Sequence, residues 1–385
     1  MSSEAAPRSW LSRSLLGRES TARVQLDSLD GVRGLAVLLV VFSHLSIYRM
    51  PIAPGVNLAG AGKYGVFLFF VLSAFLLTNG LLVRPPEQLR SAGTWRRYAV
   101  RRVLRIVPLY LVVLAVSYAG THWLGSPAFI PLSSSELVDH LLLRAGKLVY
   151  WSIPVEFKYY LVLPIATLAI SWGLKRRTLP VLVVGAAVVV LAGLVWFPGN
   201  AWPRTTVALW PYLPIFLLGT LAAFVHGLMR EAAWLERRRV RIALEAVAWS
   251  CLALVLVLVP ATWRALSGRP VSSQHFHREY LLFGSVWASF LLAELHGIGG
   301  LRRLLSTAPL RWVGAISFSV YLWHIPVLLW VRENVSIGPT SQAWLALGAV
   351  GVVSTLSYLA IERPFLRLGL RGLVAPRGLR RLSAG

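Results

Sequence analysis

Arg33 and His44 are ionisable residues in a largely apolar stretch near the start of the chain. Such groups are costly to hold inside a bilayer, so they mark functional sites by default. On a helix, eleven residues span about 16 Å along the axis and turn by roughly 20°, so the two side chains share one face. This spacing predicts a pathway from Arg33 at the cytosolic headgroups to His44 in the outer half of the membrane. Alternatively, Arg33 snorkels as an anchor and His44 hydrogen-bonds a neighbouring helix.

Glu156 and His324 are expected at a depth similar to that of His44. Glu156 lies among aromatic residues in YWSIPVEFKYY, and His324 lies in ISFSVYLWHIPV. Two histidines and a carboxylate brought together by three helices could form a general-base site. The alternatives are that Glu156 pairs with Lys158 inside an aromatic belt, and that His324 is a structural histidine before the Pro326 kink.

A cluster of arginines is expected at the cytosolic side. In RRYAVRRVLRIVPLY, Arg101, Arg102 and Arg105 fall on one helical turn, where guanidinium groups could clamp phosphates. The same residues fit the ordinary enrichment of basic residues at cytosolic membrane faces.

The other charged candidates are interpreted structurally. Glu362 is expected to pair with Arg363, and Glu245 and Glu294 with nearby arginines. His275 and His277 make a poor metal site, because the pair lies two residues apart with only Glu279 close by, so no metal is expected.

Composition places the chain in a membrane. Of 385 residues, 56% are hydrophobic and only 14% are charged, which is too little polar surface for one soluble globule. The net charge is +24, but the basic residues lie between the apolar runs, as the residues that set membrane topology do. Nucleic-acid binding is therefore disfavoured. The single cysteine, Cys251, excludes an intramolecular disulfide.

The hydropathy pattern predicts an all-α, polytopic membrane protein with about ten transmembrane helices. With the N-terminus placed inside, the cytosolic segments carry 29 Lys and Arg residues and the outer segments nine, so both termini are predicted to be cytosolic. The predicted spans are 32–48, 64–83, 106–125, 157–174, 179–198, 205–229, 242–263, 280–296, 312–331 and 341–362.

The chain is predicted to hold one membrane domain, residues 26–366, between basic cytosolic tails at 1–25 and 367–385. In the longest outer connection, Ser133 and Glu136 have the spacing of a capping box, which predicts a short helix on the outer face.

Six motifs follow one another along the sequence, namely LDGVRG followed by His44, YGVFLFFVLSAFL, RRVLRIVPLY, WSIPVEFKYY, SFSVYLWHIP and SYLAIERPF. Together they resemble the acyltransferase 3 family of integral-membrane acyltransferases, over roughly residues 26–366. Relatives usually have LSGF where this chain has Ala74 in LSAF, a difference that concerns helix packing more than chemistry.

The resemblance implies transfer of an acyl group, commonly acetyl, from acyl-CoA to a hydroxyl of a carbohydrate, a glycoconjugate or a glycosylated or polyketide metabolite. It implies acyl-CoA as co-substrate, no tightly bound cofactor, and a location in the cytoplasmic membrane. Arg33 and His44 are expected to be essential, and Glu156 to participate.

On this basis the arginines at 33, 101, 102 and 105 would bind CoA phosphates. His44, supported by Glu156, would deprotonate the acceptor hydroxyl. His324 would position the acceptor or donate to the oxyanion. An acyl-histidine intermediate at His44 is the alternative mechanism.

Two other function classes stay open. A lipid or glycoconjugate transporter or flippase would also use intramembrane charges, although the sequence has neither paired broken-helix segments nor visible repeat symmetry. A catalytically silent partner in a cell-envelope assembly would have the same fold without turnover.

Overall fold

The structure is a computed structural model that describes residues 27–123, 125, 129–173 and 178–371. The described residues form helices and loops without a strand, which confirms the all-α prediction. The predicted tail at 1–25 and most of the tail at 367–385 lie outside the described residues.

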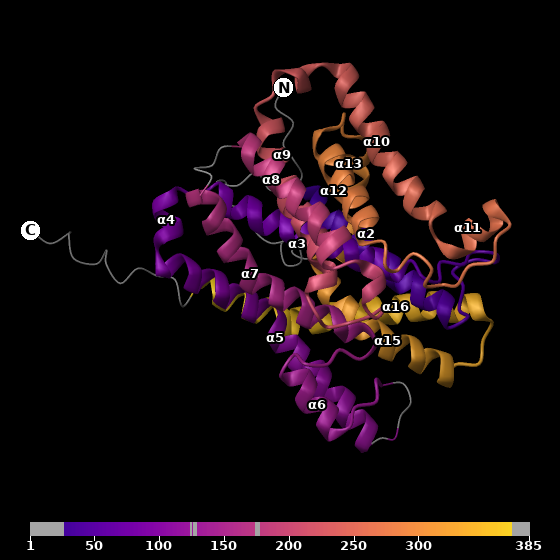
Figure 1. Cartoon of the computed structure of the whole chain (residues 1–385). Helices are drawn as coiled ribbons and strands as arrows, with labels where there is room; N and C mark the ends of the chain where they lie inside the picture. Colours follow the sequence, from indigo (N-terminus) through magenta and orange to yellow (C-terminus); the bar gives the residue numbers. More distant parts are fainter. Residues whose placement is uncertain (1–26, 124, 126–128, 174–177, 372–385) are drawn as a thin grey trace, which may run out of the picture.

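The helices follow one another along the chain, joined by loops and by short 3₁₀- or π-helical turns (Figure 1). Their bounds are α2 Asp27–Ile47, α3 Gly62–Leu82, α4 Pro86–Arg90, α5 Ala92–His122, α6 Ser134–Leu141, α7 Ser152–Gly173, α8 Thr178–Leu191, α9 Leu213–Arg230, α10 Arg238–Val257, α11 Pro260–Ser267, α12 Tyr280–His296, α13 Gly300–Leu305, α14 Ala308–Ala315, α15 Ser317–Asn334, α16 Pro339–Ser357 and α17 Arg363–Arg371. A π-helical turn, Tyr358–Glu362, joins α16 to α17.

Each of the ten predicted spans coincides with a helix or a helix pair. Among the described residues, seven helices are long and apolar enough to cross a membrane, or eight if one bent pair counts as a span. The helix α12 is apolar but shorter. A multi-pass membrane protein is therefore supported, whereas the count of ten and the cytosolic placement of both termini stay predictions.

The bent pair is α14 and α15, whose axes differ by 78°. The sequence predicts a span at 312–331 with a kink at Pro326, whereas the structure breaks this segment ten residues earlier, at Ile316. At Ile316 the backbone leaves helical geometry (φ −95°, ψ 9°), and α15 starts again at Ser317. The break leaves α14 free to pack along α2 while α15 takes its own direction.

Glycines bring the backbone of α2 into contact with α13 and α14. A Cβ atom on Gly31 would lie 1.8 Å from the carbonyl oxygen of Leu305, and one on Gly34 would lie 2.4 Å from that of Leu310. From the other side, a Cβ on Gly314 would lie 1.7 Å from the oxygen of Asp30. Small residues allow this close approach between membrane helices. The contact fixes α2, which carries both Arg33 and His44.

The charged residues near the ends of α10 and α12 are partly as predicted. Glu294 pairs with Arg302 (Oε1 to Nε, 3.8 Å), which confirms an arginine partner. For Glu245 that prediction is wrong, because its carboxylate accepts the backbone N–H groups of Gly299 (3.1 Å) and Leu301 (2.5 Å) instead. The first turn of α13 has unpaired N–H groups, and a carboxylate satisfies them well.

The capping box before α6 is confirmed. The Glu136 amide donates to Ser133 Oγ (3.2 Å), and the Ser133 amide donates to the Glu136 carboxylate (2.9 Å). These bonds, together with Lys147 at 2.9 Å, lower the pKa of Glu136 to about 2.

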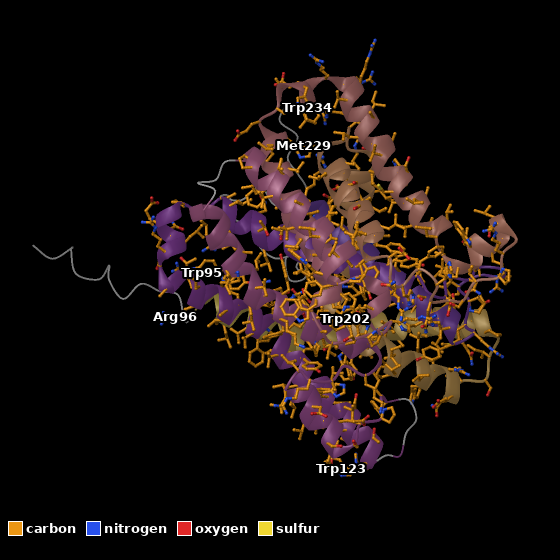
Figure 2. The ribbon with its side chains drawn as sticks, in the orientation of Figure 1. Trp95, Arg96, Trp123, Trp202, Met229 and Trp234 are labelled. Atoms are coloured by element: carbon orange, nitrogen blue, oxygen red, sulfur yellow. The ribbon has the colours of Figure 1, made fainter. Side chains whose placement is uncertain are left out.

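Tryptophans stand at both ends of the long helix α5. Trp95 lies in its first turn, at the left of Figure 2, and Trp123 lies directly after its last residue, at the bottom of the same view. Trp123 is 81% exposed, as is common for aromatic residues at a membrane–water interface.

Candidate functional site

His44 of α2 and His324 of α15 form a pair. Their ring centroids are 5.0 Å apart, and Nε2 of His324 lies 3.3 Å from Nδ1 of His44. His324 is fully buried, whereas His44 keeps part of its surface accessible. The sequence placed the two residues at a similar depth, and the structure brings them into contact.

Backbone carbonyls assign the proton positions of both rings. Nδ1 of His44 lies 2.8 Å from the oxygen of Val40, and Nδ1 of His324 lies 2.8 Å from that of Tyr321. A carbonyl oxygen can only accept, so each Nδ1 carries a proton in the neutral ring. The one Nδ1–H of His44 is then shared between the carbonyl oxygen of Val40 (2.8 Å) and Nε2 of His324 (3.3 Å). Nε2 of His44 keeps a free lone pair, which is what a general base needs.

A pocket opens next to this pair and is called here the arginine pocket. It holds about 720 Å³ of space, part of it open to solvent. Three of the four arginines expected to bind phosphate line it, namely Arg33, Arg102 and Arg105, whereas Arg101 is not among its lining residues. The other lining residues are Val66, Phe69, Phe70, Ser73, Ile106, Ser152, Ile153, Glu156, Tyr160, Ser317, Phe318 and Tyr321.

Tyr321 connects the arginine pocket to the histidine pair. Its side chain lines the pocket, its ring centroid lies 6.0 Å from that of His324, and its carbonyl accepts from Nδ1 of His324. Its hydroxyl donates to the carbonyl of Val149 (2.6 Å) and accepts from Ser152 Oγ (2.8 Å). The pocket thus extends from the arginines to within one side chain of the histidines.

Glu156 lies in the arginine pocket rather than beside His44. Its Oε1 atom accepts from Ser73 Oγ (2.6 Å) and from the hydroxyl of Tyr160. No hydrogen bond joins it to His44 within the described part of the chain. The alternative ion pair with Lys158 does not form either, because Nζ of Lys158 donates to the carbonyl of Val207 at 2.7 Å.

Two of the pocket arginines are held by carboxylates. Arg33 pairs with Asp30 at 2.7 Å, and Arg105 pairs with Glu362 at 3.3 Å. Glu362 is buried and also accepts from Ser319 Oγ. The predicted pair between Glu362 and Arg363 is therefore wrong. Consecutive residues on a helix point in different directions, so Glu362 can face the bundle interior independently of its neighbour.

Arg102 is held differently from the other two. Its guanidinium carbon lies 5.7 Å from the ring centroid of Tyr160, in a cation–π contact. Tyr160 therefore contacts both Arg102 and Glu156. The sequence analysis missed Tyr160, although its spacing of four residues from Glu156 could have indicated the contact.

A second histidine pair lies elsewhere in the bundle. Nδ1 of His226 lies 3.0 Å from Nε2 of His296, between α9 and α12. These residues line another pocket, with Arg230 and Arg302, that shares no lining residue with the arginine pocket. The His226–His296 pair has a nitrogen–nitrogen contact similar to that of His44 and His324, so it can serve as a control for the first pair.

His277 has a structural partner in the outer loops. Its Nε2 atom lies 2.9 Å from the carbonyl oxygen of Gly60. The described residues contain no group of three or more histidine, cysteine or acidic side chains placed to hold a metal ion.

Comparison with known proteins gives one family. A family model described as an acyltransferase domain matches residues 26–362. A peptidoglycan O-acetyltransferase of Listeria monocytogenes is 25% identical over 90% of this chain and 57% of its own length. A protein of Bacillus subtilis, provisionally named a peptidoglycan O-acetyltransferase, is 26% identical over 90% of this chain and 56% of its own.

A protein of Komagataeibacter xylinus, provisionally named a membrane-bound transacylase, is 27% identical over 97% of this chain and 90% of its own. The chain spans little more than half the length of the first two relatives. No solved structure matches it.

Proposed function

Because the chain belongs to this acyltransferase family, we propose that it transfers an acyl group, acetyl in the simplest case, from acyl-CoA to a hydroxyl of a carbohydrate or glycoside. The observation that carries the proposal is the arginine pocket, which leads from three guanidinium groups to Tyr321, whose ring centroid lies 6.0 Å from that of His324. The cytoplasmic membrane is the proposed location. The names of two relatives, which refer to peptidoglycan, support a carbohydrate acceptor.

Arg33, Arg102 and Arg105 bind the phosphates of CoA in this proposal. Three guanidinium groups around one pocket match the several negative charges of such a ligand. The apolar part of the pocket, which includes Phe69 and Phe318, receives the pantetheine arm. The role expected for Arg101 remains a separate prediction, since it neighbours Arg102 in sequence but not in the pocket lining.

Glu156 binds the acyl-CoA donor in this proposal. Its carboxylate already accepts from Ser73 and Tyr160, and it has further lone pairs for the amide N–H groups of the pantetheine arm. This interpretation replaces support of His44 by Glu156, for which the site geometry offers no contact.

His44 acts as the general base through Nε2. It takes the proton of the acceptor hydroxyl while that oxygen attacks the thioester carbonyl. The C–S bond then breaks, and the CoA thiolate leaves with the proton that His44 held. His324 acts through His44: its unprotonated Nε2 accepts from Nδ1–H and holds the ring, and stabilises the imidazolium that forms. With its proton on Nδ1, His324 has no proton on Nε2 to donate to an oxyanion.

The alternative mechanism passes through acyl-His44. Nε2 attacks the thioester, CoA leaves, and the acceptor hydroxyl then takes the acyl group from the imidazole. Ping-pong kinetics, or labelled acyl trapped on His44, favours this route, whereas a ternary-complex pattern favours direct transfer.

Release of free CoA tests the function. Purified protein in lipid nanodiscs, given acetyl-CoA and an extract of envelope saccharides, is expected to release CoA and acetylate the saccharides. His44→Ala is expected to stop both, while the matched variant His226→Ala in the second pair keeps them. If the wild-type protein moves saccharide lipids across liposomes without consuming thioester, the transferase is wrong and the transporter alternative gains support.

A further inference from the structure

A row of side chains leads away from the histidine pair at the ends of α2 and α15. The ring of Tyr48, directly after α2, lies 6.4 Å from that of His44. The guanidinium carbon of Arg332, in the last turn of α15, lies 5.8 Å from the Tyr48 ring centroid. Arg332 follows His324 by eight residues, whereas the pocket-lining Ser317 precedes it. The row therefore leaves the pair on the side opposite to the arginine pocket.

No carboxylate among the described residues pairs with the guanidinium of Arg332. Within the described part of the chain, its side chain makes the contact with Tyr48 but neither an ion pair nor a hydrogen bond. Arg332 is itself exposed, as is the neighbouring Glu333, and successive helical residues point in different directions. Arg49, next to Tyr48, is likewise exposed, without an ion pair or side-chain hydrogen bond among the described residues.

These arginines also run against the charge pattern of the chain. The predicted topology places both on the outer side, where membrane proteins are depleted of Lys and Arg. Arg49 additionally occupies a left-handed backbone conformation (φ 62°), which non-glycine residues rarely adopt. Because both side chains are exposed, their guanidinium groups are accessible to an anion that arrives from outside. A guanidinium recognises carboxylate and phosphate groups best.

We infer that the acceptor is an anionic glycoside, whose carboxylate or phosphate binds Arg332 at the outer mouth while its hydroxyl reaches Nε2 of His44. This inference rests on the proposed function and names its acceptor class. Tyr48 lies between the two groups, 6.4 Å from the His44 ring and 5.8 Å from the Arg332 guanidinium. The imidazole and the guanidinium are therefore no farther apart than the sum of these two distances, which a disaccharide can span. Donor and acceptor then enter the site from opposite sides.

Tyr48 is the positioning residue of this arrangement. Its ring holds the guanidinium of Arg332 by a cation–π contact, which reduces the freedom that the long side chain loses when it binds an anion. The ring is the part that matters for this role. Tyr48→Phe is therefore expected to retain it, and Tyr48→Leu to lose it.

A pair of acceptors that differ only in charge tests the inference. The probes are a disaccharide of N-acetylglucosamine and N-acetylmuramic acid, which bears a carboxylate, and its carboxamide. With saturating acetyl-CoA, wild-type protein is expected to show a kcat/KM at least about tenfold higher for the carboxylate, as a charge-assisted hydrogen bond provides. Arg332→Gln is expected to erase the preference through the KM of the acceptor, with the KM of acetyl-CoA unchanged. Arg332→Lys is expected to keep part of it.

Controls separate this site from general surface charge. Arg269→Gln, which removes an exposed arginine from another outer loop, is expected to keep the full preference. Tyr48→Leu is expected to reduce it and Tyr48→Phe to preserve it. Equal use of both disaccharides by the wild type, use of neither, or an equal loss for both in Arg332→Gln overturns the inference.

The proposed function can fail separately. Wild-type protein that releases CoA with envelope saccharides but shows no charge preference keeps the transferase and overturns the anion site. Protein that releases no CoA with any acceptor overturns both.

Discussion

His324 contacts His44 through the Nδ1 side of the imidazole and leaves Nε2 of His44 with a free lone pair. Both rings are also hydrogen-bonded to carbonyl oxygens of their own helices. The pair is therefore oriented before any substrate arrives. Preorganisation of this kind is what a catalytic base requires.

Loss of the acceptor nitrogen of His324 should slow the chemical step. We expect His324→Leu to lower kcat by about 100-fold with little change in the KM of acyl-CoA, because the ring of His44 loses its support but the donor pocket stays intact. His324→Gln supplies a side-chain oxygen that can accept from Nδ1–H, so it should recover part of kcat. Steady-state kinetics measures both. Equal rates for the Leu and Gln variants would show that hydrogen bonding to His44 is not the role of His324.

Arg102 and Arg101 differ in their relation to the pocket, although they are neighbours in sequence. We expect Arg102→Gln to raise the KM of acyl-CoA by roughly tenfold, because a charge-assisted contact to phosphate is lost. The change for Arg101→Gln should be smaller. A donor lacking the nucleotide phosphates should bind both variants alike. An effect of Arg101→Gln as large as that of Arg102→Gln would contradict the assignment of the phosphate site to this pocket.

Gly34 lies where α2 touches the backbone of α14. We expect Gly34→Ala to lower the free energy of unfolding by about 1 to 3 kcal/mol, because the new methyl group overlaps a carbonyl oxygen that cannot easily move. Gly348→Ala is the matched control, since nothing lies near its Cβ position. That variant should be neutral or gain up to about 1 kcal/mol from helix propensity. Thermal unfolding in detergent compares them, and equal behaviour would mean that the contact between α2 and α14 is loose.

His277 should make stability depend on pH. Burial, with smaller contributions from the charges of Lys63 and Arg204, lowers its pKa to about 4 from an ordinary value of 6.5. Between these values the unfolded chain binds more protons than the folded one, so the free energy of unfolding falls as the pH is lowered from about 6.5 towards 4. Above pH 6.5 the residue adds no pH dependence.

Melting temperatures between pH 7.5 and 4.5 check this expectation. The melting temperature of wild-type protein should fall more steeply with acid than that of His277→Gln. The exposed neighbour His275 provides the control, since His275→Gln should follow the wild-type curve. Parallel curves for wild type and His277→Gln would exclude a buried neutral histidine at this position.

Features that depend on one helix were predictable from the sequence. The shared face of Arg33 and His44, the helical segments and the capping box at Ser133 follow from spacing, periodicity and local hydrogen bonding. Depth in the membrane could also be inferred, because it depends only on the distance from the end of a span. For this reason His44 and His324 were expected at the same level.

Contacts between helices were less predictable. Spacing gives the depth of Glu156 but not the identity of the helix that it faces, and its partners prove to be Ser73 and Tyr160. Glu362 likewise reaches Arg105 across the bundle rather than its sequence neighbour. Such partners are decided by how helices rotate and pack against one another. The break at Ile316 has the same origin, since no proline marks it.

The glycine contacts of α2 give this helix a further property. Its close backbone contacts with α13 and α14 restrict sliding and rotation of α2, so Arg33 and His44 stay at a constant separation. Under the proposed function, a donor reacts only if its arm is long enough to span the distance between these two side chains. A truncated thioester would occupy the site yet place its carbonyl short of the imidazole, so selection among thioesters would come from reach rather than from recognition of the acyl group.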